Sequence, residues 1–369
     1  MTQNKSLTVI GLMSGTTFDG VDAAVIKTDG EKINDLGPTI TITYPEDFRN
    51  KIRNITTGSI DLKNILELED EITLLHCHAV QELLKTNKIS KEDIDLVAFH
   101  GQTIYHDSKN CKTWQLANGS LMVRELGINV ITDFRRRDLA HGGEGAPLVP
   151  FFHKAISESM PKPIAFVNIG GVSNITYVNK DGEMVAFDSG PGCALIDDWV
   201  YTRVKTPFDY NGEIAARGKS NKHKIDYFIE STPFFNQVPP KSLDRNEFSN
   251  IFRKLSSLNT ADGAATLTEL SARAIHEGKK FLPSQPEQWV VCGGGRKNKY
   301  LMNLLRDKYQ LNVVNIDDLK FNNFKLDGDF IEAQAFAYLG ARSFKNLPYT
   351  LPSTTGAIQP ASGGAFYQA

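Results

Sequence analysis

The sequence predicts an α/β protein made of two related domains. The chain has 369 residues, whereas single hydrophobic cores stop growing at ~250–300 residues. A strand, a glycine-rich turn and a second strand open each half, at residues 7–26 and again at 164–178. Apolar strands then alternate with helical patterns in both halves, which is typical of sheets with parallel crossovers. We therefore expect a duplicated architecture.

The first half shows a three-stranded meander followed by crossovers. Apolar side chains recur at helical spacing in its one long helix, form apolar runs in most of its strands and alternate with Thr at 38–44. The predicted elements are strands at 7–10, 21–26 and 38–44, a helix at 65–83, a strand at 95–99, a helix at 121–126 and a strand at 130–131. The order is β-β-β-α-β-α-β.

The second half repeats the strand, turn and strand pattern after a loop rich in Gly, Arg and Asp. The predicted elements are that loop at 133–150, a helix at 149–159, strands at 164–168, 175–178 and 184–187, mixed helices and loops at 205–260, a helix at 266–281, a strand at 289–292, helices at 299–305 and 330–344, and a closing loop at 347–364. We expect an N-terminal domain of residues 1–132 and 346–369 and a C-terminal domain of residues 133–345.

Composition excludes several classes of function. The net charge of -2 gives no field that attracts nucleic acid or an anionic membrane. No run reaches the ~18–20 apolar residues of a membrane span, and the first residues lack the apolar core of a signal peptide. The 4 cysteines show no paired spacing, which favours neither disulfides nor a zinc site. A reducing cytoplasm is the expected location, without nucleic acid or membrane partners.

The most informative motif is the turn between the first two strands, residues 11–22. Its glycines let the backbone approach a ligand, and its amides and hydroxyls suit a polyphosphate. Its candidate ligand groups are Ser14, Thr16, Thr17, Asp19 and Asp22. The two carboxylates are oxygen ligands of the kind that phosphate-bound Mg2+ prefers. An ordinary Gly/Asp hairpin is the alternative, and the later glycine-rich loops favour the binding interpretation.

Two further loops place glycines after strands. Asp188 precedes Ser-Gly-Pro-Gly and a helical stretch at 194–200, a position suited to acid–base chemistry, although it equally suits a turn or helix cap. The second loop, Gly293–Gly295, follows a strand and precedes a helix that would direct its N-terminus at a ligand. The sequence contains no Gly-x-x-x-x-Gly-Lys-Ser/Thr element and no Gly-x-Ser-x-Gly elbow.

A cluster of arginines at 135–137, the arginine loop, follows the strand that ends at Asp133. Arginines recognise carboxylates and phosphates through paired hydrogen bonds, although such a loop can also be simply solvated. His100 and His106 flank a turn without the companions of a metal site, and His76 and His78 lie on different faces of a helix. We expect the arginine loop, and not these histidines, to contribute charge to a site.

Taken together, the motifs closely resemble the anhydro-N-acetylmuramic acid kinase family. The matching segments are Ile10–Asp22, His100–Ile104, Asp133–Asp138, Gly145–Pro150, Asn168–Thr176, Phe187–Gly192, Cys292–Gly295 and Glu332–Ala337. They occur in order over nearly the whole chain.

The resemblance implies a fold and a reaction. The fold is that of the sugar kinase/Hsp70/actin superfamily, ribonuclease H-like, with duplicated mixed-sheet α/β domains and an active site holding ATP and Mg2+ in the cleft between them. In the reaction, water opens the 1,6-anhydro ring, and ATP phosphorylates O6 to give N-acetylmuramate 6-phosphate and ADP in peptidoglycan recycling. Asp188 matches the family's catalytic base, which takes a proton from the water that attacks C1.

The resemblance also divides the site residues by ligand. The expected ATP-binding residues are Gly15, Thr16, Thr17, Phe18, Asp19, Gly20, Val21, Asp22, Asn168, Gly170, Gly171, Ser173, Gly293, Gly294 and Gly295. The expected sugar-binding residues are His100, Gln102, Asp133, Arg135, Arg136, Asp138 and Glu332. The expected ligands of Mg2+ are Asp19 and Asp22. Charge alone suggests that Arg135 or Arg136 meets the lactyl carboxylate.

The sequence departs from the family pattern in a few places. Ser189 and Cys193 replace a usual Thr and Asn, Leu243 and Asp244 replace a usual Thr-Gly pair, and Phe18 replaces a smaller apolar residue. These changes affect the surroundings of the base and one wall of the expected cleft.

Two alternatives remain open at this point. A levoglucosan kinase would act on a sugar without lactyl and acetamido groups, so its pocket would need no cation, and the arginine loop favours the muramic sugar. A sensor on the same fold would bind sugar or nucleotide without turnover, and the presence of Asp188 and Asp19 argues against it. The expected partners are ATP and the anhydro amino sugar. A homodimer is an assembly that the residues neither require nor exclude.

Overall fold

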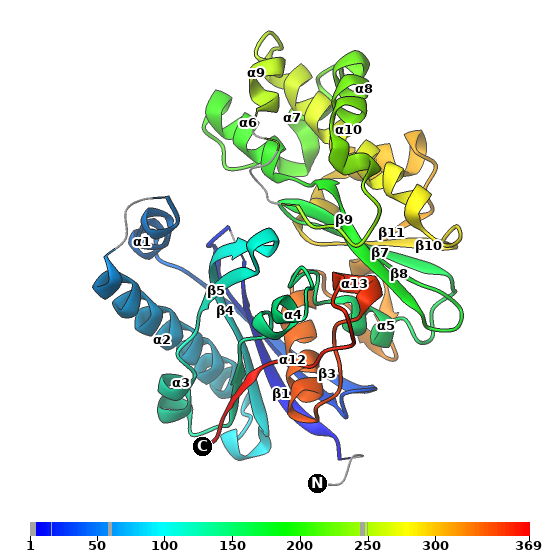
Figure 1. Ribbon diagram of the computed structural model, residues 1–369. Helices are drawn as coiled ribbons and strands as arrows, with labels where there is room; N and C mark the ends of the chain where they lie inside the picture. Colours follow the sequence, from blue (N-terminus) through cyan, green and yellow to red (C-terminus); the bar gives the residue numbers. More distant parts are fainter. Residues whose placement is uncertain (1–4, 16, 58–60, 244–247, 249) are drawn as a thin grey trace. The chain divides into compact units, whose positions relative to one another are not determined.

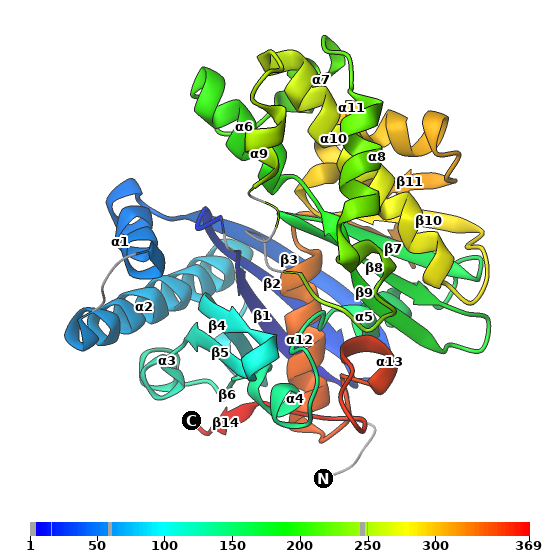
Figure 2. The same cartoon turned by 45° about the horizontal axis from the view of Figure 1, so that its top comes forward.

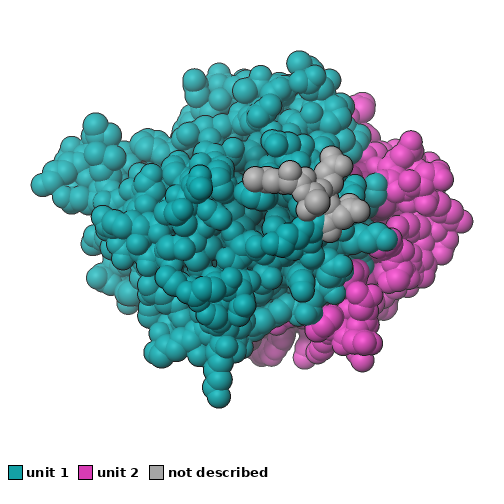
Figure 3. Space-filling view, turned by 90° about the horizontal axis from the view of Figure 1, so that it is seen from below, with its two compact units in different colours: residues 1–156, 330–369 teal, residues 157–329 magenta. Residues whose placement is uncertain are grey.

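The computed structural model describes residues 5–15, 17–57, 61–243, 248 and 250–369, and the chain in it divides into two compact units. Unit 1 contains residues 1–156 and 330–369, and unit 2 contains residues 157–329 (Figures 1 and 3). The boundaries differ from the expected ones, which assigned 133–156 and the helix at 330–344 to the second domain. That helix belongs to unit 1 because it packs on the first strands of the chain.

The sheet of unit 1 is built on the meander that the sequence predicts. Its strands are β1 (Leu7–Ser14), β2 (Gly20–Thr28), β3 (Ile33–Thr43), β4 (Leu96–Asp107), β5 (Lys112–Leu116), β6 (Val130–Thr132) and β14 (Ala365–Tyr367). The order is β14-β6-β4-β1-β2-β3, with β5 paired to β4. β1, β4 and β6 run parallel, and β2 is antiparallel to both β1 and β3.

Helices cover both faces of this sheet (Figures 1 and 2). The helices of unit 1 are α1 (Glu46–Thr57), α2 (Leu62–Asn87), α3 (Gly119–Leu126), α4 (Arg136–Ala140), α5 (Pro150–Ile156), α12 (Ile331–Phe344) and α13 (Pro352–Thr355). Alternation along β1 directs Ile10 and Leu12 into the core that α2 shares, whereas Gly11 faces α12. Unit 1 is therefore a three-layer arrangement in which α12 needs a very close approach to β1.

The sheet of unit 2 repeats the central strand order of unit 1. Its strands are β7 (Ile164–Ile169), β8 (Val172–Val178), β9 (Met184–Pro191), β10 (Gln288–Cys292) and β11 (Val313–Asn315), in the order β11-β10-β7-β8-β9. β7, β10 and β11 run parallel, and β8 is antiparallel to β7 and β9. Strands β6-β4-β1-β2-β3 of unit 1 have the same order and directions. This duplication confirms the α/β fold class expected from the sequence.

A helical layer completes unit 2. Its helices are α6 (Ala194–Val204), α7 (Glu213–Ala216), α8 (Lys222–Ser231), α9 (Ile251–Leu255), α10 (Thr260–Gly278) and α11 (Lys299–Asn303), which continues into a π-helical turn at Leu304–Lys308. A short hairpin of β12 (Lys320–Phe321) and β13 (Phe324–Lys325) follows. α6 to α10 enclose a second core around Trp199, Phe228 and Phe235. Phe228 and Phe235 lie in the region predicted as mixed helices and loops, and Trp199 lies in the helical stretch predicted at 194–200.

The structure contains elements that periodicity did not indicate. α1 and β5 lie in segments that carried no prediction, and α4 lies inside the predicted loop at 133–150. The closing segment does pack on unit 1, as expected, but it ends in β14, which pairs antiparallel with β6. Among the described helices, none combines the length and apolar character needed to cross a membrane.

The contact between β1 and α12 gives a first prediction. A Cβ atom at Gly11 would overlap the carbonyl oxygen of Ala333 and the amide of Ala337, which are backbone atoms that cannot rotate away. We expect Gly11→Ala to lower the free energy of unfolding by about 1–3 kcal/mol or more, as overpacked cores do. Urea unfolding followed by circular dichroism measures it.

The matched control is Gly294→Ala, because a Cβ there meets no atom within 4 Å. Equal stability of the two variants would contradict the packing argument.

Candidate functional site

The turn between β1 and β2 is bound by Gln102, a residue predicted to contact the sugar. Gln102 Nε2 donates to the carbonyl oxygen of Gly15 at 3.2 Å, and Phe18 N donates to the same oxygen at 3.2 Å. Phe18 has a φ of 60°, an uncommon conformation for an aromatic residue that the tight turn imposes. The Val21 side chain lies in the core of unit 1, so only its backbone can face a ligand. Thr16 lies outside the described residues.

The two carboxylates of this turn differ in their surroundings. Asp19 is exposed and pairs with Arg49, with 3.0 Å between Arg49 Nη2 and Asp19 Oδ1. Asp22 is partly buried on β2 and accepts from Thr41 Oγ1 at 2.6 Å. Thr17 is exposed beside them. Mg2+ commonly keeps several waters and uses one or two carboxylates plus phosphates, so this pair fits a metal that arrives with a nucleotide.

His100 and Arg135 form a fixed pair at the end of the buried part of β4. Arg135 Nε donates to His100 Nε2 at 3.0 Å, and the other ring nitrogen, Nδ1, donates to the carbonyl oxygen of Gly101 at 2.7 Å. Burial, reinforced by the Arg135 charge, holds the pKa of His100 well below its usual value. His100 is therefore a neutral imidazole that orients the guanidinium.

Arg135 is a preoriented cation. Its Nη1 donates to the carbonyl oxygen of Gly145 at 2.7 Å. Burial lowers the pKa of Arg135 to about 10, against the opposing charge of Glu332 on α12, so the guanidinium stays protonated at neutral pH. Arg136 differs: its side chain is 58% exposed, and its nearest carboxylate is Asp133 at 3.6 Å.

The carboxylate of Asp138 is used to bind the loop that contains Gly145, and it is buried there. Its Oδ2 accepts from Gly145 N at 2.8 Å, and its Oδ1 accepts from Thr355 Oγ1 at 2.7 Å. The residue is only 2% exposed. The carboxylate thus ties the loop after α4 to α13 near the C-terminus, a structural use of a residue that the sequence assigned to sugar.

In unit 2, the loop predicted at 169–174 is a tight turn. β7 and β8 remain paired up to Ile169 and Ser173, so Gly170 and Gly171 alone make the turn. Their carbonyl oxygens accept from the segment before α6, including Cys193 N to Gly170 O at 2.7 Å. Cys193 is the N-cap residue of α6, without a side-chain capping bond. The turn is therefore fixed to the start of that helix.

Ser173 is buried and bound within the unit. Its hydroxyl lies 2.8 Å from the Ser189 hydroxyl and 3.2 Å from the carbonyl oxygen of Gly190. The departure at Ser189 keeps a hydroxyl that makes this bond. These contacts connect β8 to the last part of β9, next to Asp188.

Asp188 lies within β9, which continues to Pro191, and not at the end of a strand as expected. The N-cap of α6 is Cys193, so Asp188 does not cap that helix. Its backbone N donates to the carbonyl oxygen of Lys241 at 3.0 Å, and its Oδ2 accepts from Leu243 N at 2.8 Å. Two backbone contacts with the segment after η4 (Pro233–Asn236) thus orient the carboxylate, which is 9% exposed.

The glycines of the 293–295 loop have different roles. A Cβ at Gly293 would overlap the Asn168 side-chain oxygen, and one at Gly295 would overlap Ile169. These two glycines allow the loop to pack against the end of β7. Gly294 is exposed, and a Cβ there would meet nothing within 4 Å. The structure therefore brings Asn168 and this loop together, and it leaves Gly294 without close neighbours on the side where a Cβ would lie.

Arg296, which follows the glycines directly, binds the loop through its side chain. Its Nη1 donates to the carbonyl oxygen of Gly293 at 3.1 Å, and the guanidinium pairs with Asp317 at 2.8 Å and Asp329 at 2.9 Å. The sequence analysis missed this network. A signal was present, because an arginine follows the glycines directly and an Asp-Gly-Asp segment at 327–329 precedes α12.

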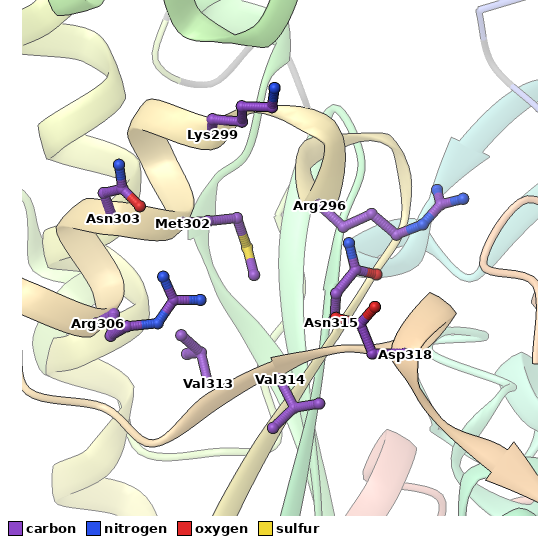
Figure 4. A pocket seen from close by; sticks show the side chains of 9 residues that line it. All are labelled: Arg296, Lys299, Met302, Asn303, Arg306, Val313, Val314, Asn315 and Asp318. Carbon is purple, nitrogen blue, oxygen red and sulfur yellow. The ribbon is translucent and has the colours of Figure 1, made fainter.

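A hollow of about 410 Å³ lies beside this loop, between α11 and β11 (Figure 4). Its lining residues are Arg296, Lys299, Met302, Asn303, Arg306, Val313, Val314, Asn315 and Asp318. Met302 and the two valines give an apolar floor, and Lys299 and Arg306 contribute exposed cations. No sequence motif indicated it.

Comparison with known proteins decides the family. The family model described as anhydro-N-acetylmuramic acid kinase matches residues 7–369. The anhydro-N-acetylmuramic acid kinase of Methylobacterium nodulans is 41% identical over 374 residues, covering 96% of this chain and 98% of that protein. The chain belongs to the anhydro-N-acetylmuramic acid kinase family.

A second curated relative agrees with this assignment. The anhydro-N-acetylmuramic acid kinase of Rhodopseudomonas palustris strain BisB18 is 42% identical over 368 residues, covering 97% of this chain and 99% of that protein. Among solved structures, the activator of 2-hydroxyisocaproyl-CoA dehydratase from Clostridium difficile with bound ADPNP aligns with a TM-score of 0.48 at 14% identity, over 92% of this chain and 96% of that one.

The family segments lie at defined places in the two units. Unit 1 brings together the first turn, Gln102, the His100–Arg135 pair and Asp138. Unit 2 brings together Asn168, the turn at 170–171, Ser173, Asp188 and the 293–295 loop. Asp244, one of the family departures, lies outside the described residues. Among those residues no cluster of three or more His, Cys, Asp or Glu side chains forms a metal site.

The neutral state of His100 gives a prediction on pH. Because the pKa of His100 is depressed in the folded protein, the unfolded chain binds the proton more tightly. The contribution of His100 to the free energy of unfolding is therefore fully present above pH ~6.5 and is lost as the pH decreases. The loss is at most about 1.4 kcal/mol per pH unit for this residue. We expect His100→Gln, which keeps an acceptor for Arg135, to lose less stability than the parent chain between pH 6.5 and 5, by up to about 2 kcal/mol.

Urea unfolding at both pH values measures the difference. The control is His223→Gln, which removes an exposed imidazole at the start of α8. If His100→Gln and His223→Gln behaved alike, His100 would not be held neutral.

Proposed function

We propose that this chain phosphorylates 1,6-anhydro-N-acetylmuramic acid with ATP, opening the anhydro ring with water. The observation that carries the proposal is the family match over nearly the full chain, combined with an oriented carboxylate at the matching position, Asp188. The first turn and the arginine loop belong to unit 1, and Asp188 belongs to unit 2.

The proposed reaction balances in two bond exchanges. Asp188 takes a proton from water, the water oxygen bonds to C1, and the C1–O6 bond breaks. O6 then bonds to the γ-phosphorus, and the oxygen that bridges the β- and γ-phosphates leaves with ADP. Phosphoryl transfer needs mainly positioning and charge neutralisation, whereas ring opening needs a base, and one fixed carboxylate satisfies that requirement.

The nucleotide is assigned to the glycine-containing turns. The first turn and the turn at 170–171 present backbone to the phosphates, and the exposed Gly294 presents open backbone to the adenosine. The hollow beside α11 is a neighbouring space of nucleoside size. Mg2+ bound with ATP would be held through Asp19 or Asp22, and it would supply neutralisation of phosphate charge.

The sugar is assigned to the fixed cation of unit 1. Arg135 is the better candidate for the lactyl carboxylate because two hydrogen bonds hold it before any ligand arrives. Arg136 is exposed and would lose more side-chain freedom on binding. Levoglucosan, which has no carboxylate, would gain nothing from either residue.

The first experiment measures ADP release with Mg·ATP and three sugars: 1,6-anhydro-N-acetylmuramic acid, levoglucosan and N-acetylmuramic acid. In ¹⁸O-labelled water we expect turnover of the muramic anhydrosugar and one labelled oxygen in the product. N-acetylmuramic acid incubated alone in labelled water corrects for exchange at C1. Asp188→Asn keeps the acceptor for Leu243 N and should lose turnover by about 10²–10⁴-fold while binding ATP.

Other outcomes favour other functions. Turnover of levoglucosan alone would indicate the related anhydrosugar kinase. Binding of sugar or ATP without turnover would indicate a sensor. Near-normal turnover by Asp188→Asn would remove this residue from the role of base.

The assignment of the lactyl carboxylate gives a separate prediction. We expect Arg135→Ala to raise KM for the muramic anhydrosugar by about tenfold or more, because a preoriented charge-assisted contact is lost. Arg136→Ala should change the same KM by less than about threefold, because exposed charges contribute little. Steady-state kinetics at saturating ATP measures both. The reverse ranking of the two variants would assign the carboxylate to Arg136.

A further inference from the structure

Lys241 places a buried ammonium group beside the proposed base. The residue is 2% exposed, and its Nζ donates to the carbonyl oxygen of Phe234 at 2.9 Å. The same Nζ lies 4.4 Å from the ring centroids of both Phe234 and Phe281. Within the described part of the chain, no carboxylate lies within ion-pair distance of it. Burying such a charge is costly, so its position requires an explanation.

The backbone of residues 241–243 makes two hydrogen bonds to Asp188. The carbonyl oxygen of Lys241 accepts from Asp188 N, and the amide two residues later, Leu243 N, donates to Asp188 Oδ2. The side chain of Lys241 is inserted among aromatic rings from β9, η4 and η5 (Lys279–Phe281). The ammonium thus anchors the segment whose backbone orients the carboxylate.

The charges around Lys241 favour an ionised carboxylate. Burial and the Lys280 charge on η5 together lower the pKa of Lys241 to about 8, against the opposing effect of the Asp188 charge on β9. Lys280 itself lies near Glu277 of α10, at 3.8 Å. Lys241 therefore carries a positive charge at neutral pH, and that charge stabilises the anionic form of Asp188.

We propose that Lys241 is a positioning residue, whose anchored ammonium fixes the backbone of 241–243 around Asp188 and keeps that carboxylate ionised. The inference rests on the proposed function, in which Asp188 is the base. It assigns a role in the reaction to a residue that need not touch either substrate.

The test compares Lys241→Met with the parent chain. Met retains the length of the side chain and its contact with the aromatic rings, but removes the charge and the hydrogen-bond donor. We expect kcat to fall by about tenfold or more, with KM for ATP within about twofold. The acid limb of the kcat/KM profile should move to higher pH by about half a unit or more, because Asp188 loses a stabilising cation.

Two further variants make the result specific. Lys241→Arg retains the charge, so its acid limb should stay at the parent pH even where its larger head lowers kcat. Lys280→Met removes a neighbouring cation that lies 5.1 Å from the Phe281 ring and takes no part in the hydrogen bonds between residues 241–243 and Asp188. This variant should retain kcat within about twofold.

Contradictory results are equally clear. A parent chain that turns over, together with a Lys241→Met variant of unchanged kcat and acid limb, would overturn the role of Lys241 alone. Loss of folding in Lys241→Met would transfer the decision to Lys241→Arg, where a displaced acid limb would also overturn it. A parent chain inactive with every sugar would overturn the proposed function and this inference with it.

Discussion

Close approach of a helix to a strand is the constraint on which both units depend. In unit 1, α12 approaches β1 so closely that only glycine fits at position 11, against the backbone of Ala333 and Ala337. In unit 2, α10 approaches β9, where a Cβ at Gly190 would lie 2.7 Å from the Cβ of Ala274. Small residues at these points let a helix pack flat on a sheet of the same topology. The contact in unit 1 also joins the last long helix to the first strand.

Side chains bound to backbone atoms fix the loops that carry the candidate site. Arg135 and Asp138 bind backbone atoms of Gly145, and Arg296 binds the carbonyl oxygen of Gly293. A charged group that donates to or accepts from backbone gives a stronger hydrogen bond than a neutral one. Ordering a loop rich in glycine costs much conformational entropy, and these hydrogen bonds offset that cost. The same charged residue types that the motifs indicate as ligand contacts therefore also maintain the shape of the site.

The sequence predicts where most strands lie, but it does not predict how long they are. It also identifies the residues of the site motifs, but it does not show which residues those side chains contact. The apolar run ending at Phe99 identifies β4, but β4 continues to Asp107 because pairing with β5 extends it past the apolar residues. The domain boundary could not be predicted either, since the close packing of α12 on β1 is a contact between residues over 300 positions apart in the sequence. For the site, periodicity could not reveal that backbone atoms near Lys241 hold Asp188.

The glycines of the family motifs separate into two groups once the structure is known. Cβ atoms at Gly20, Gly293 and Gly295 would overlap neighbouring atoms, so packing alone requires glycine there. At Gly15, Gly170, Gly171 and Gly294 an added Cβ would meet no atom closer than 3.5 Å. Packing does not explain glycine at these four positions, whereas a phosphate or nucleoside lying against the backbone would. The four open glycines are consequently the strongest candidates for direct contact with ATP.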